Sequence, residues 1–182
     1  MFERSDETLV KQALKGKKSA WISLVQRYEK NLYNYTLRMV SNSEDALDLM
    51  QDIFVAVFRN LSTFRGESPF KGWLFKIAHY RCIEFYRRKK PSQSLDDAPE
   101  QQSEDSKACP EYLMVSSQQA QALHQAMQFL PFNQKVVVEM KFFQQFTFED
   151  IAEQLGISTN TAKSRLYSAL DKLKGQLGGS YV

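Results

Sequence analysis

The sequence predicts an all-α protein of two helical domains joined by a flexible acidic linker. Two blocks carry apolar residues at the 3.6-residue spacing of amphipathic helices, and strand-like alternation does not stand out in either. Between them, "KKPSQSLDDAPEQQSEDSKACPE" has three prolines and four serines but hardly an apolar residue, which is typical of a linker. We therefore expect a first domain at 1–90, the linker at 91–113 and a second domain at 114–182.

Composition and charge distribution favour a folded protein with a basic body. Hydrophobic residues make up 43% of the chain and aromatic residues 13%, enough for a core. Six acids and one base between Pro91 and Glu111 give that segment a charge of −5, so the rest of the chain must carry +8 to give the net charge of +3. A basic body suits a nucleic-acid binder, although many cytosolic proteins are mildly basic without binding nucleic acid.

Several function classes find no support. Cys82 and Cys109 are the only cysteines, and with His79 and His124 they form no metal-binding spacing, so we expect no metal and no cofactor. No apolar run approaches a membrane span and the N-terminus lacks a signal core, which predicts a cytoplasmic protein without membrane insertion. We find no nucleophile–base pairing and no phosphate-binding glycine loop, so we do not expect an enzyme.

The first domain is predicted to contain three helices. One long helix, begun by Ser19, runs from Trp21 to Met39 on helical spacing, and "SNSEDALDLMQDIFVAVFRNL" supplies the next. Gly66 breaks the pattern, and Pro69 suits the first position of a third helix because its missing N–H costs nothing there.

The second domain carries the spacing of a helix-turn-helix. Pro131 begins a helix that should end near Phe143, and Thr147 with Asp150 resembles a capping box that opens a short helix. Gly156 makes the turn and Ser158 caps the final helix. Helix-turn-helix proteins bring the N-terminal half of that final helix to the major groove of DNA.

The final helix opens with small polar residues followed by bases. Small side chains let the backbone approach phosphate, Lys163 and Arg165 can neutralise phosphate or contact guanine, and Asn160 can contact adenine. The alternative is an ordinary helical hairpin with a solvated basic face. The candidate DNA-binding residues of this helix are Thr159, Asn160, Thr161, Lys163, Ser164, Arg165 and Tyr167.

An acidic stripe marks the second helix of the first domain. Asp45, Asp48 and Asp52 fall on one helix face with Gln51 beside them, and three carboxylates so placed repel one another without a partner. A docking surface for a basic partner fits better than a metal site, which needs inward carboxylates and usually histidine. A solvated acidic face is the alternative.

Aromatic residues alternate with bases along the third helix. Lys76, Tyr80 and Arg87 share a face, a pattern that can stack on nucleobases and pair with phosphates. The polar loop from Phe64 to Pro69 could form a pocket for an extruded base. A solvated helix end remains the alternative for the terminal "RRKK" run.

Taken in order, the segments "LVQRYEKNLYNYTLRMV", "DALDLMQDIFVAVFRNLSTFRG", "SPFKGWLFKIAHYRCIEFYRRKK" and "FEDIAEQLGISTNTAKSRLYSAL" resemble successive segments of an extracytoplasmic-function (ECF) sigma factor of bacterial RNA polymerase. The resemblance covers nearly the whole chain. It implies a promoter-specificity subunit that binds core polymerase, helps melt promoter DNA and is controlled by an anti-sigma factor.

The resemblance also implies three sets of contacts. The acidic face would dock on the β′ clamp coiled coil, with the β flap as a further polymerase contact, and the linker would follow the RNA exit path. The final helix would contact the minus-thirty-five element through its candidate residues. The residues implied at the polymerase are Asp45, Asp48, Leu49, Gln51 and Asp52, and those implied at the minus-ten element are Arg65, Lys71, Lys76, Tyr80, Arg81, Arg87 and Arg88.

Two departures from the family pattern limit what carries over. Asp52 stands where the family often has Glu, and Asn160 stands where it often has glycine, so promoter preference does not transfer. Two other functions are alternatives to a sigma factor: a stand-alone helix-turn-helix regulator, and a helical adaptor without DNA contacts. The first gives the acidic stripe and the basic aromatic helix no role, and the second predicts that reversing the charge of Lys163 and Arg165 is harmless.

Overall fold

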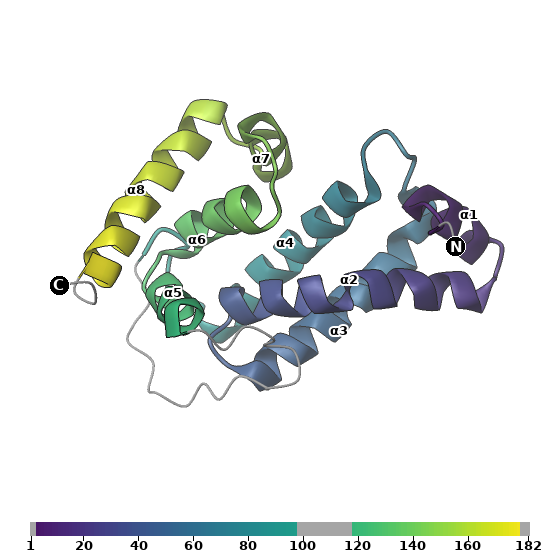
Figure 1. The fold of residues 1–182 in the computed structure, drawn as a ribbon, viewed down its shortest axis with the longest axis horizontal. Coiled ribbons are helices and arrows are strands. Elements are labelled where there is room, and N and C mark those ends of the chain that lie inside the picture. The colour runs from purple at the N-terminus through teal and green to yellow at the C-terminus, as the bar shows by residue number, and fades with distance from the viewer. Residues whose placement is uncertain (1–2, 98–117, 179–182) are drawn as a thin grey trace.

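The computed structural model describes residues 3–97 and 118–178, and all regular secondary structure in these ranges is helical (Figure 1). The predicted all-α class is therefore confirmed. The N-terminal domain precedes the undescribed residues 98–117 and the C-terminal domain follows them.

The N-terminal domain is built on three long helices, and the third lies antiparallel alongside the second, with ion pairs between them at two points. These are α2 (Lys18–Met39), α3 (Ser43–Asn60), which ends in the 3-10 turn η1 (Leu61–Thr63), and α4 (Phe70–Lys89). The expected stripes are largely buried: Leu32, Ile53 and Leu74 are each at most 1% exposed. Pro69 occupies the N-cap of α4, one position before the helix rather than its first residue.

A short helix, α1 (Asp6–Leu14), precedes these and was not predicted, because only Leu9 and Val10 of its nine residues are buried. Its start is fixed by Ser5, whose hydroxyl accepts from the Thr8 amide. Asp6 then accepts hydrogen bonds from Arg27 and Tyr28 on α2.

The predicted cap of α2 is wrong. Lys17 is the N-cap, and the Ala20 amide already donates to the Lys17 carbonyl at 3.0 Å. Ser19 therefore lies inside the first turn, where its carbonyl accepts from the Ser23 hydroxyl.

The C-terminal domain contains α5 (Gln118–Gln128), α6 (Phe132–Val138), η2 (Glu139–Phe143), α7 (Phe148–Leu155) and α8 (Thr159–Leu177). The helix expected to run from Pro131 to near Phe143 is present, but its last five residues form a wider π turn. These helices share a hydrophobic core, which includes the fully buried residues Met127, Val137, Ile151 and Ala162.

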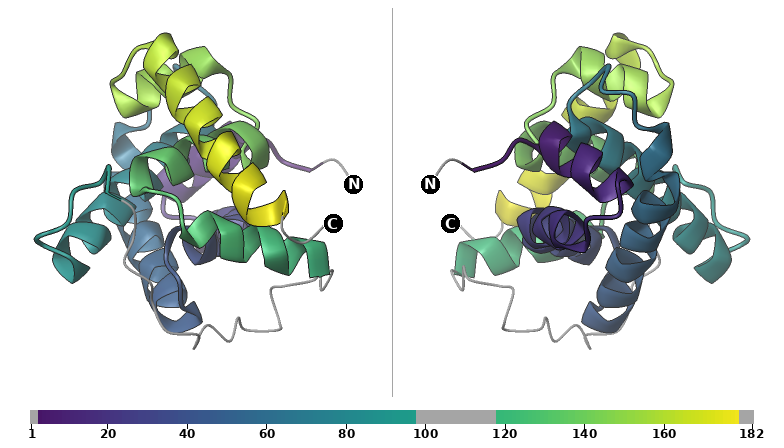
Figure 2. Two further views of the ribbon diagram at one scale, coloured as in Figure 1. Left: turned by 90° about the vertical axis from the view of Figure 1, so that its left-hand side faces the viewer. Right: turned by 90° about the vertical axis from the view of Figure 1, so that its right-hand side faces the viewer.

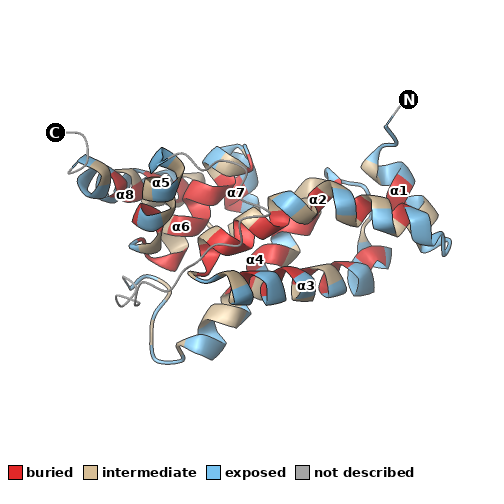
Figure 3. Cartoon of the chain, turned by 60° about the horizontal axis from the view of Figure 1, so that its bottom comes forward, coloured by how far each residue is buried: buried red, intermediate tan, exposed pale blue. Residues whose placement is uncertain are grey.

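The two domains pack against each other across α2 and α4 (Figures 2 and 3). Phe132 stacks on His79 with ring centroids 6.1 Å apart and meets Tyr86 at 5.2 Å. Phe75 of α4 contacts Phe146, which follows η2, at 6.4 Å. The buried apolar residues of both domains consequently form one continuous cluster.

The beginning of the predicted linker is anchored to the C-terminal domain. The Leu95 carbonyl accepts from the Asn133 amide at 3.2 Å, and the Asp96 carboxylate accepts from the Asn133 side chain at 2.6 Å. Residues 91–97 therefore belong to the folded structure, which corrects a linker that was expected to be flexible throughout. The remainder of the predicted linker, and the start of the second domain at 114, lie outside the described residues.

Two histidines at the domain boundary are held neutral. Burial, with the nearby Arg165 charge, lowers the pKa of His79 to about 4. Burial also lowers the pKa of His124 to about 4, with Lys135 and Arg38 adding to the effect. Neither ring is easily protonated while the domains stay packed.

We predict that acid destabilises this boundary. Each histidine binds a proton more weakly in the folded protein than at its ordinary pKa of 6.5, so its stabilising contribution is complete above pH 6.5 and disappears as the pH falls toward 4. The loss should be on the order of 1–3 kcal/mol per histidine. Urea unfolding between pH 7 and 4 measures it.

The variant His79→Phe is the matched test, because a phenyl ring can stack on Phe132 but does not titrate. It should show a shallower loss of stability with falling pH than the wild type. Identical pH profiles for the two proteins would contradict the assignment.

Candidate nucleic-acid interface

The helix-turn-helix is specified by local hydrogen bonds. The Thr147 hydroxyl accepts from the Asp150 amide, and the Asp150 carboxylate accepts from the Thr147 amide, each at 3.1 Å. Gly156 adopts φ +64° between α7 and α8, and the Ser158 hydroxyl accepts from the Thr161 amide at 3.0 Å. The predicted capping box, turn glycine and cap are all confirmed.

The N-terminal half of α8 presents a polar and basic face to solvent. The apolar side chains Ala162, Leu166, Ala169 and Leu173 face the core. Among the candidate DNA-binding residues, Asn160, Lys163, Ser164 and Tyr167 are exposed. A helix N-terminus also offers unpaired amides and a positive dipole end, so this face is suited to phosphate.

The other three candidates on α8 are less accessible. Thr159, Thr161 and Arg165 are half-buried, and the Thr161 hydroxyl is hydrogen-bonded to the Ser158 hydroxyl at 2.8 Å. Arg165 lies close enough to His79 of α4 for its charge to lower the pKa of that ring. Sequence spacing placed Arg165 beside Lys163 but could not indicate that it lies near the other domain.

Most of the candidate residues for the minus-ten element lie on the outward face of α4. Lys76, Tyr80, Arg87 and Arg88 are exposed, as is Arg65 in the preceding loop. The shared face predicted for these bases and Tyr80 therefore faces solvent.

Lys71 and Arg81 differ from the rest of this set. The Lys71 ammonium donates to the Gln144 carbonyl at 3.0 Å, and burial lowers its pKa. Arg81 lies 2.9 Å from the Glu84 carboxylate and 3.8 Å from that of Asp52. Lys71 thus donates a hydrogen bond to the C-terminal domain. Arg81 of α4 pairs with a carboxylate on its own helix and also lies near one on α3.

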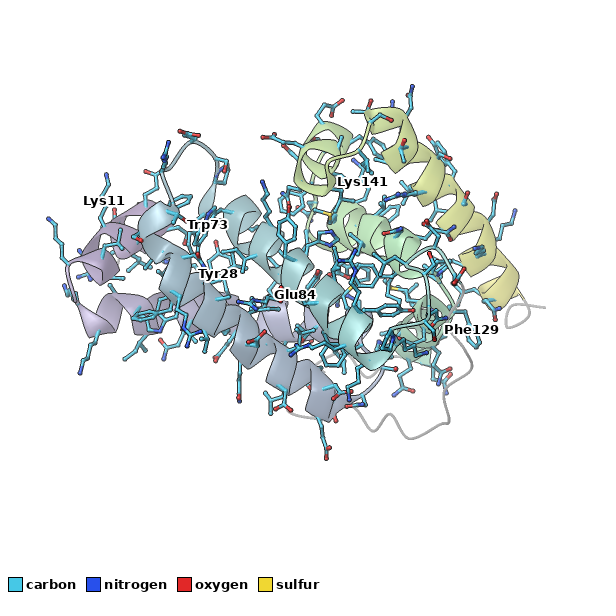
Figure 4. The ribbon with its side chains drawn as sticks, turned by 180° about the vertical axis from the view of Figure 1, so that it is seen from behind. Lys11, Tyr28, Trp73, Glu84, Phe129 and Lys141 are labelled. Atoms are coloured by element: carbon cyan, nitrogen blue, oxygen red, sulfur yellow. The ribbon has the colours of Figure 1, made fainter. Side chains whose placement is uncertain are left out.

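A cavity of about 320 Å³ opens between the C-terminal half of α3 and α4. Two of its lining residues, Trp73 and Glu84, are labelled in Figure 4. None of the residues that line this cavity belongs to the loop from Phe64 to Pro69, for which a pocket was predicted, although Thr63 immediately precedes that loop. Its walls combine aromatic, amide and charged groups: Ala56, Asn60, Thr63, Trp73, Ile77, Tyr80, Arg81 and Glu84.

The acidic stripe on α3 is partly neutralised from within the domain. Asp45 lies 3.4 Å from the Lys89 ammonium and Asp52 pairs with Arg81. Asp48 and Gln51 are exposed. Leu49 is a correction to the candidate set: its side chain is 2% exposed in the core, so it supports this face but cannot contact a partner.

An apolar ridge beside the acidic stripe was missed. Trp21 of α2 packs edge-on against Phe54 and Phe58 of α3, with centroids 6.4 and 5.1 Å away. Phe58 is 58% exposed and Val55 46% exposed. The signal was present in the sequence, because these α3 residues fall outside the buried stripe of that helix.

Within residues 3–97 and 118–178, no group of three or more histidine, cysteine or carboxylate side chains could hold a metal ion. Among the helices in those same ranges, none is long and apolar enough to cross a membrane.

Comparison with known proteins identifies both domains. Residues 24–91 match the family model described as Sigma-70 region 2, and residues 120–173 match Sigma-70, region 4. The chain is 32% identical to the RNA polymerase sigma factor YlaC of Bacillus subtilis, over 83% of this chain and 88% of that protein. It is 27% identical to the ECF RNA polymerase sigma-E factor of Escherichia coli, over 95% and 94% of the two chains.

The chain therefore belongs to the RNA polymerase sigma factors, and specifically to their ECF type. This confirms the family inferred from the four segments. Sigma factors are non-catalytic, so membership also bears out the expectation that the protein is not an enzyme. The two sigma domains imply binding to core polymerase and to promoter DNA.

Two solved structures share the fold over most of the chain. CnrH in complex with the cytosolic domain of CnrY has a TM-score of 0.67 at 23% identity, covering 97% of this chain and 99% of that one. The sigma factor RpoE of Bartonella quintana, in complex with the anti-sigma factor NepR, has a TM-score of 0.66 at 20% identity, covering 86% and 97%.

We predict that the turn between α7 and α8 requires glycine at position 156. Gly156→Ala should destabilise the protein by about 1 kcal/mol, because φ +64° is strained for a residue with a Cβ. Gly175→Ala is the matched control: it lies inside α8 with nothing within 4 Å of a new Cβ and should stabilise by roughly 0.5–1 kcal/mol. Chemical denaturation measures both, and changes of the same sign would contradict the argument.

Proposed function

We propose that this sigma factor binds core RNA polymerase through the acidic face of α3, with Asp48 and Gln51 at its centre and Asp45 and Asp52 at its edge. The β′ clamp coiled coil is the partner implied by the family resemblance. Both central side chains are exposed and Asp48 has no ion pair closer than 4.0 Å within the described residues. The apolar ridge formed by Trp21, Phe54 and Phe58 extends this face, so the docked surface combines charge with apolar burial.

The proposed DNA contacts lie on two helices. Asn160, Lys163, Ser164 and Tyr167 of α8 contact the minus-thirty-five element in the major groove, and their exposure at a capped helix N-terminus is the observation that carries this proposal. The outward bases and Tyr80 of α4 bind the minus-ten element. The cavity between α3 and α4 receives a base extruded from the melted strand, since aromatic walls with polar groups suit a flipped base.

The remaining partners are proposed from the family and its relatives. The C-terminal domain contacts the β flap of the polymerase, and the protein acts in the cytoplasm, where transcription occurs. An anti-sigma factor controls it, a proposal supported by the two similar structures, since RpoE is held by the anti-sigma factor NepR and CnrH by the cytosolic domain of CnrY.

We predict that Asp48→Ala weakens binding to core polymerase about tenfold, because an exposed carboxylate at the centre of an interface is lost. The double variant Asp48→Ala/Asp52→Ala should be weaker still. Fluorescence anisotropy with purified core polymerase measures the affinity. Asp171→Ala, at an exposed position on α8, is the matched control and should bind like the wild type. Equal affinities for Asp48→Ala and Asp171→Ala would place the docking surface elsewhere.

We predict that Lys163→Glu abolishes promoter selection by the holoenzyme while leaving core binding intact. The change puts a negative charge where the α8 N-terminus approaches phosphate. Lys172→Glu, an exposed position farther along α8, is the control and should retain selectivity. Genome-wide transcription with reconstituted holoenzymes gives the readout. Loss of core binding by Lys163→Glu would refute the proposed division of labour between the domains.

A further inference from the structure

Phe148, the first residue of α7, is contacted by two lysine side chains. The ammonium nitrogen of Lys141 in η2 lies 4.6 Å from the centre of the Phe148 ring, and that of Lys163 in α8 lies 5.6 Å from it. Both nitrogens are within the roughly 6 Å over which the negative face of an aromatic ring attracts a cation. Three consecutive elements of the C-terminal domain therefore bring two positive charges to one ring (Lys141 is labelled in Figure 4).

The two ammonium groups lie close to each other because they share this ring. Since both distances end at the same ring centre, the nitrogens are at most about 10 Å apart. That separation is close to the Debye length of about 8 Å at physiological salt, so water and salt screen the mutual repulsion only in part. An anion bound between the two nitrogens removes this repulsion, and the pair therefore favours a negatively charged ligand.

In the part of the chain that the structure describes, no carboxylate oxygen lies within 4.0 Å of either ammonium nitrogen. Asp150 of α7 is committed to the capping box, where its carboxylate accepts from the amide and the hydroxyl of Thr147. Lys141 donates to the Phe146 carbonyl at 3.4 Å, which leaves two of its three N–H groups for a ligand. Lys163 is exposed. Both ammonium groups can therefore bind an anion from outside the chain.

The pair lies at the edge of the α8 face proposed to contact DNA. Lys163 belongs to that face, together with the exposed residues Asn160, Ser164 and Tyr167. Lys141 comes from outside the final helix and lies beside the first residue of α7, which is the first helix of the motif. In helix-turn-helix complexes the second helix enters the major groove, while the first crosses the DNA backbone. A cation beside the first helix therefore meets phosphate rather than the edges of bases.

We propose that Lys141, Phe148 and Lys163 form a phosphate clamp, in which the Phe148 ring positions both ammonium groups against the DNA backbone beside the groove that α8 enters. The inference rests on the proposed function, because it deepens the contact made by α8. One DNA strand carries a phosphate every 3.4 Å along the helix axis, so nitrogens up to about 10 Å apart reach the same phosphate or neighbouring ones. Lys141 is then a phosphate ligand, and Phe148 is a positioning residue that acts through the two lysines.

The ring contributes by restricting two flexible side chains before DNA arrives. A lysine loses much of its rotamer freedom when it is fixed against a phosphate, and this loss opposes binding. A lysine already held over an aromatic ring has lost part of that freedom, so binding costs less. Phe148 is half-buried and also packs against the hydrophobic core. Leucine at this position keeps the apolar packing but offers no aromatic face, whereas tyrosine keeps the ring.

The first test measures promoter binding by the reconstituted holoenzyme at several salt concentrations. Lys141→Gln should reduce the slope of log K against log[salt] by about 0.9, the value for one phosphate contact. It should weaken binding by the same factor for a matched promoter and for one with a scrambled minus-thirty-five element. Lys174→Gln, at an exposed position near the end of α8, is the matched control and should keep the wild-type slope. Equal slopes for Lys141→Gln and Lys174→Gln would overturn the proposal.

A double-mutant cycle tests the role of the ring. Phe148→Leu should weaken promoter binding about threefold, the scale of one cation–π contact, while Phe148→Tyr should bind like the wild type. In the Phe148→Leu background, Lys141→Gln should cost clearly less affinity than it costs in the wild type, because the lysine is no longer positioned. Additive losses would refute the positioning role of the ring. Circular dichroism of each variant verifies that it is folded.

Nuclear magnetic resonance on the full chain, with 13C-labelled lysine, tests the ring contacts if Phe148→Leu does not fold. The ε-methylene protons of Lys141 and Lys163 should resonate upfield of those of Lys174, because the ring current of Phe148 shields groups above its face. The variants Lys141→Gln and Lys163→Gln assign the two signals. Shifts equal to that of Lys174 would show that the ring does not hold these lysines and would overturn the clamp.

Lys163→Gln separates this inference from the proposed function. If Lys163→Gln reduces the salt slope and Lys141→Gln does not, α8 contacts DNA without the clamp, and only this inference fails. If neither variant changes the slope while the holoenzyme still selects its promoter, α8 does not face DNA, and the proposed function fails as well. A reduced slope for both variants is the result that the clamp requires.

Discussion

The arrangement of the whole protein depends on the burial of the C-terminal half of α2. Six of its residues between Leu32 and Met39 are buried, and they cover more than half of the helix circumference rather than one narrow stripe. A helix with so wide a buried face needs neighbours on several sides, and those neighbours come from both domains. Thr36 shows how this segment is enclosed, because it is fully buried and its hydroxyl lies 2.9 Å from the carbonyls of both Tyr33 and Ala46, either of which can accept its one hydrogen. The domain boundary is therefore an extension of the core.

Sequence reasoning succeeded where the determinants are local. The capping box at Thr147, the turn at Gly156 and the cap at Ser158 each depend on residues within a few positions, and all three lie where the pattern predicted. The helix α1 was missed because a polar nine-residue helix has little periodicity of its own and is held by contacts with Arg27 and Tyr28. The π turn η2 was missed for a similar reason, since nothing in its sequence distinguishes it from ordinary helix.

The sequence predicted which residues of the candidate site face outward on their helices, but not which of them are packed against the other domain. Exposure of Asn160, Lys163 and Tyr80 followed from helix periodicity alone. The positions of Lys71 and Arg165 did not, because both depend on packing between residues about 70 to 90 positions apart in the chain. Likewise Leu49 is adjacent in sequence to Asp48, yet its side chain lies in the core whereas that of Asp48 is exposed. Spacing distinguishes faces of one helix, whereas the partners of each face depend on the tertiary fold.

The ion pairs between α3 and α4 differ in kind from the one between domains. Asp52 with Arg81 and Asp45 with Lys89 are 3.8 and 3.4 Å apart, and these side chains are partly exposed. Pairs of this type contribute about 0–1 kcal/mol and are weakened by salt. They keep the acidic stripe from repelling itself while leaving each charge available to a stronger partner. Arg38 and Glu139, which form the pair between the domains, are largely shielded from water, so the loss of either partner would leave the other charge buried and unpaired.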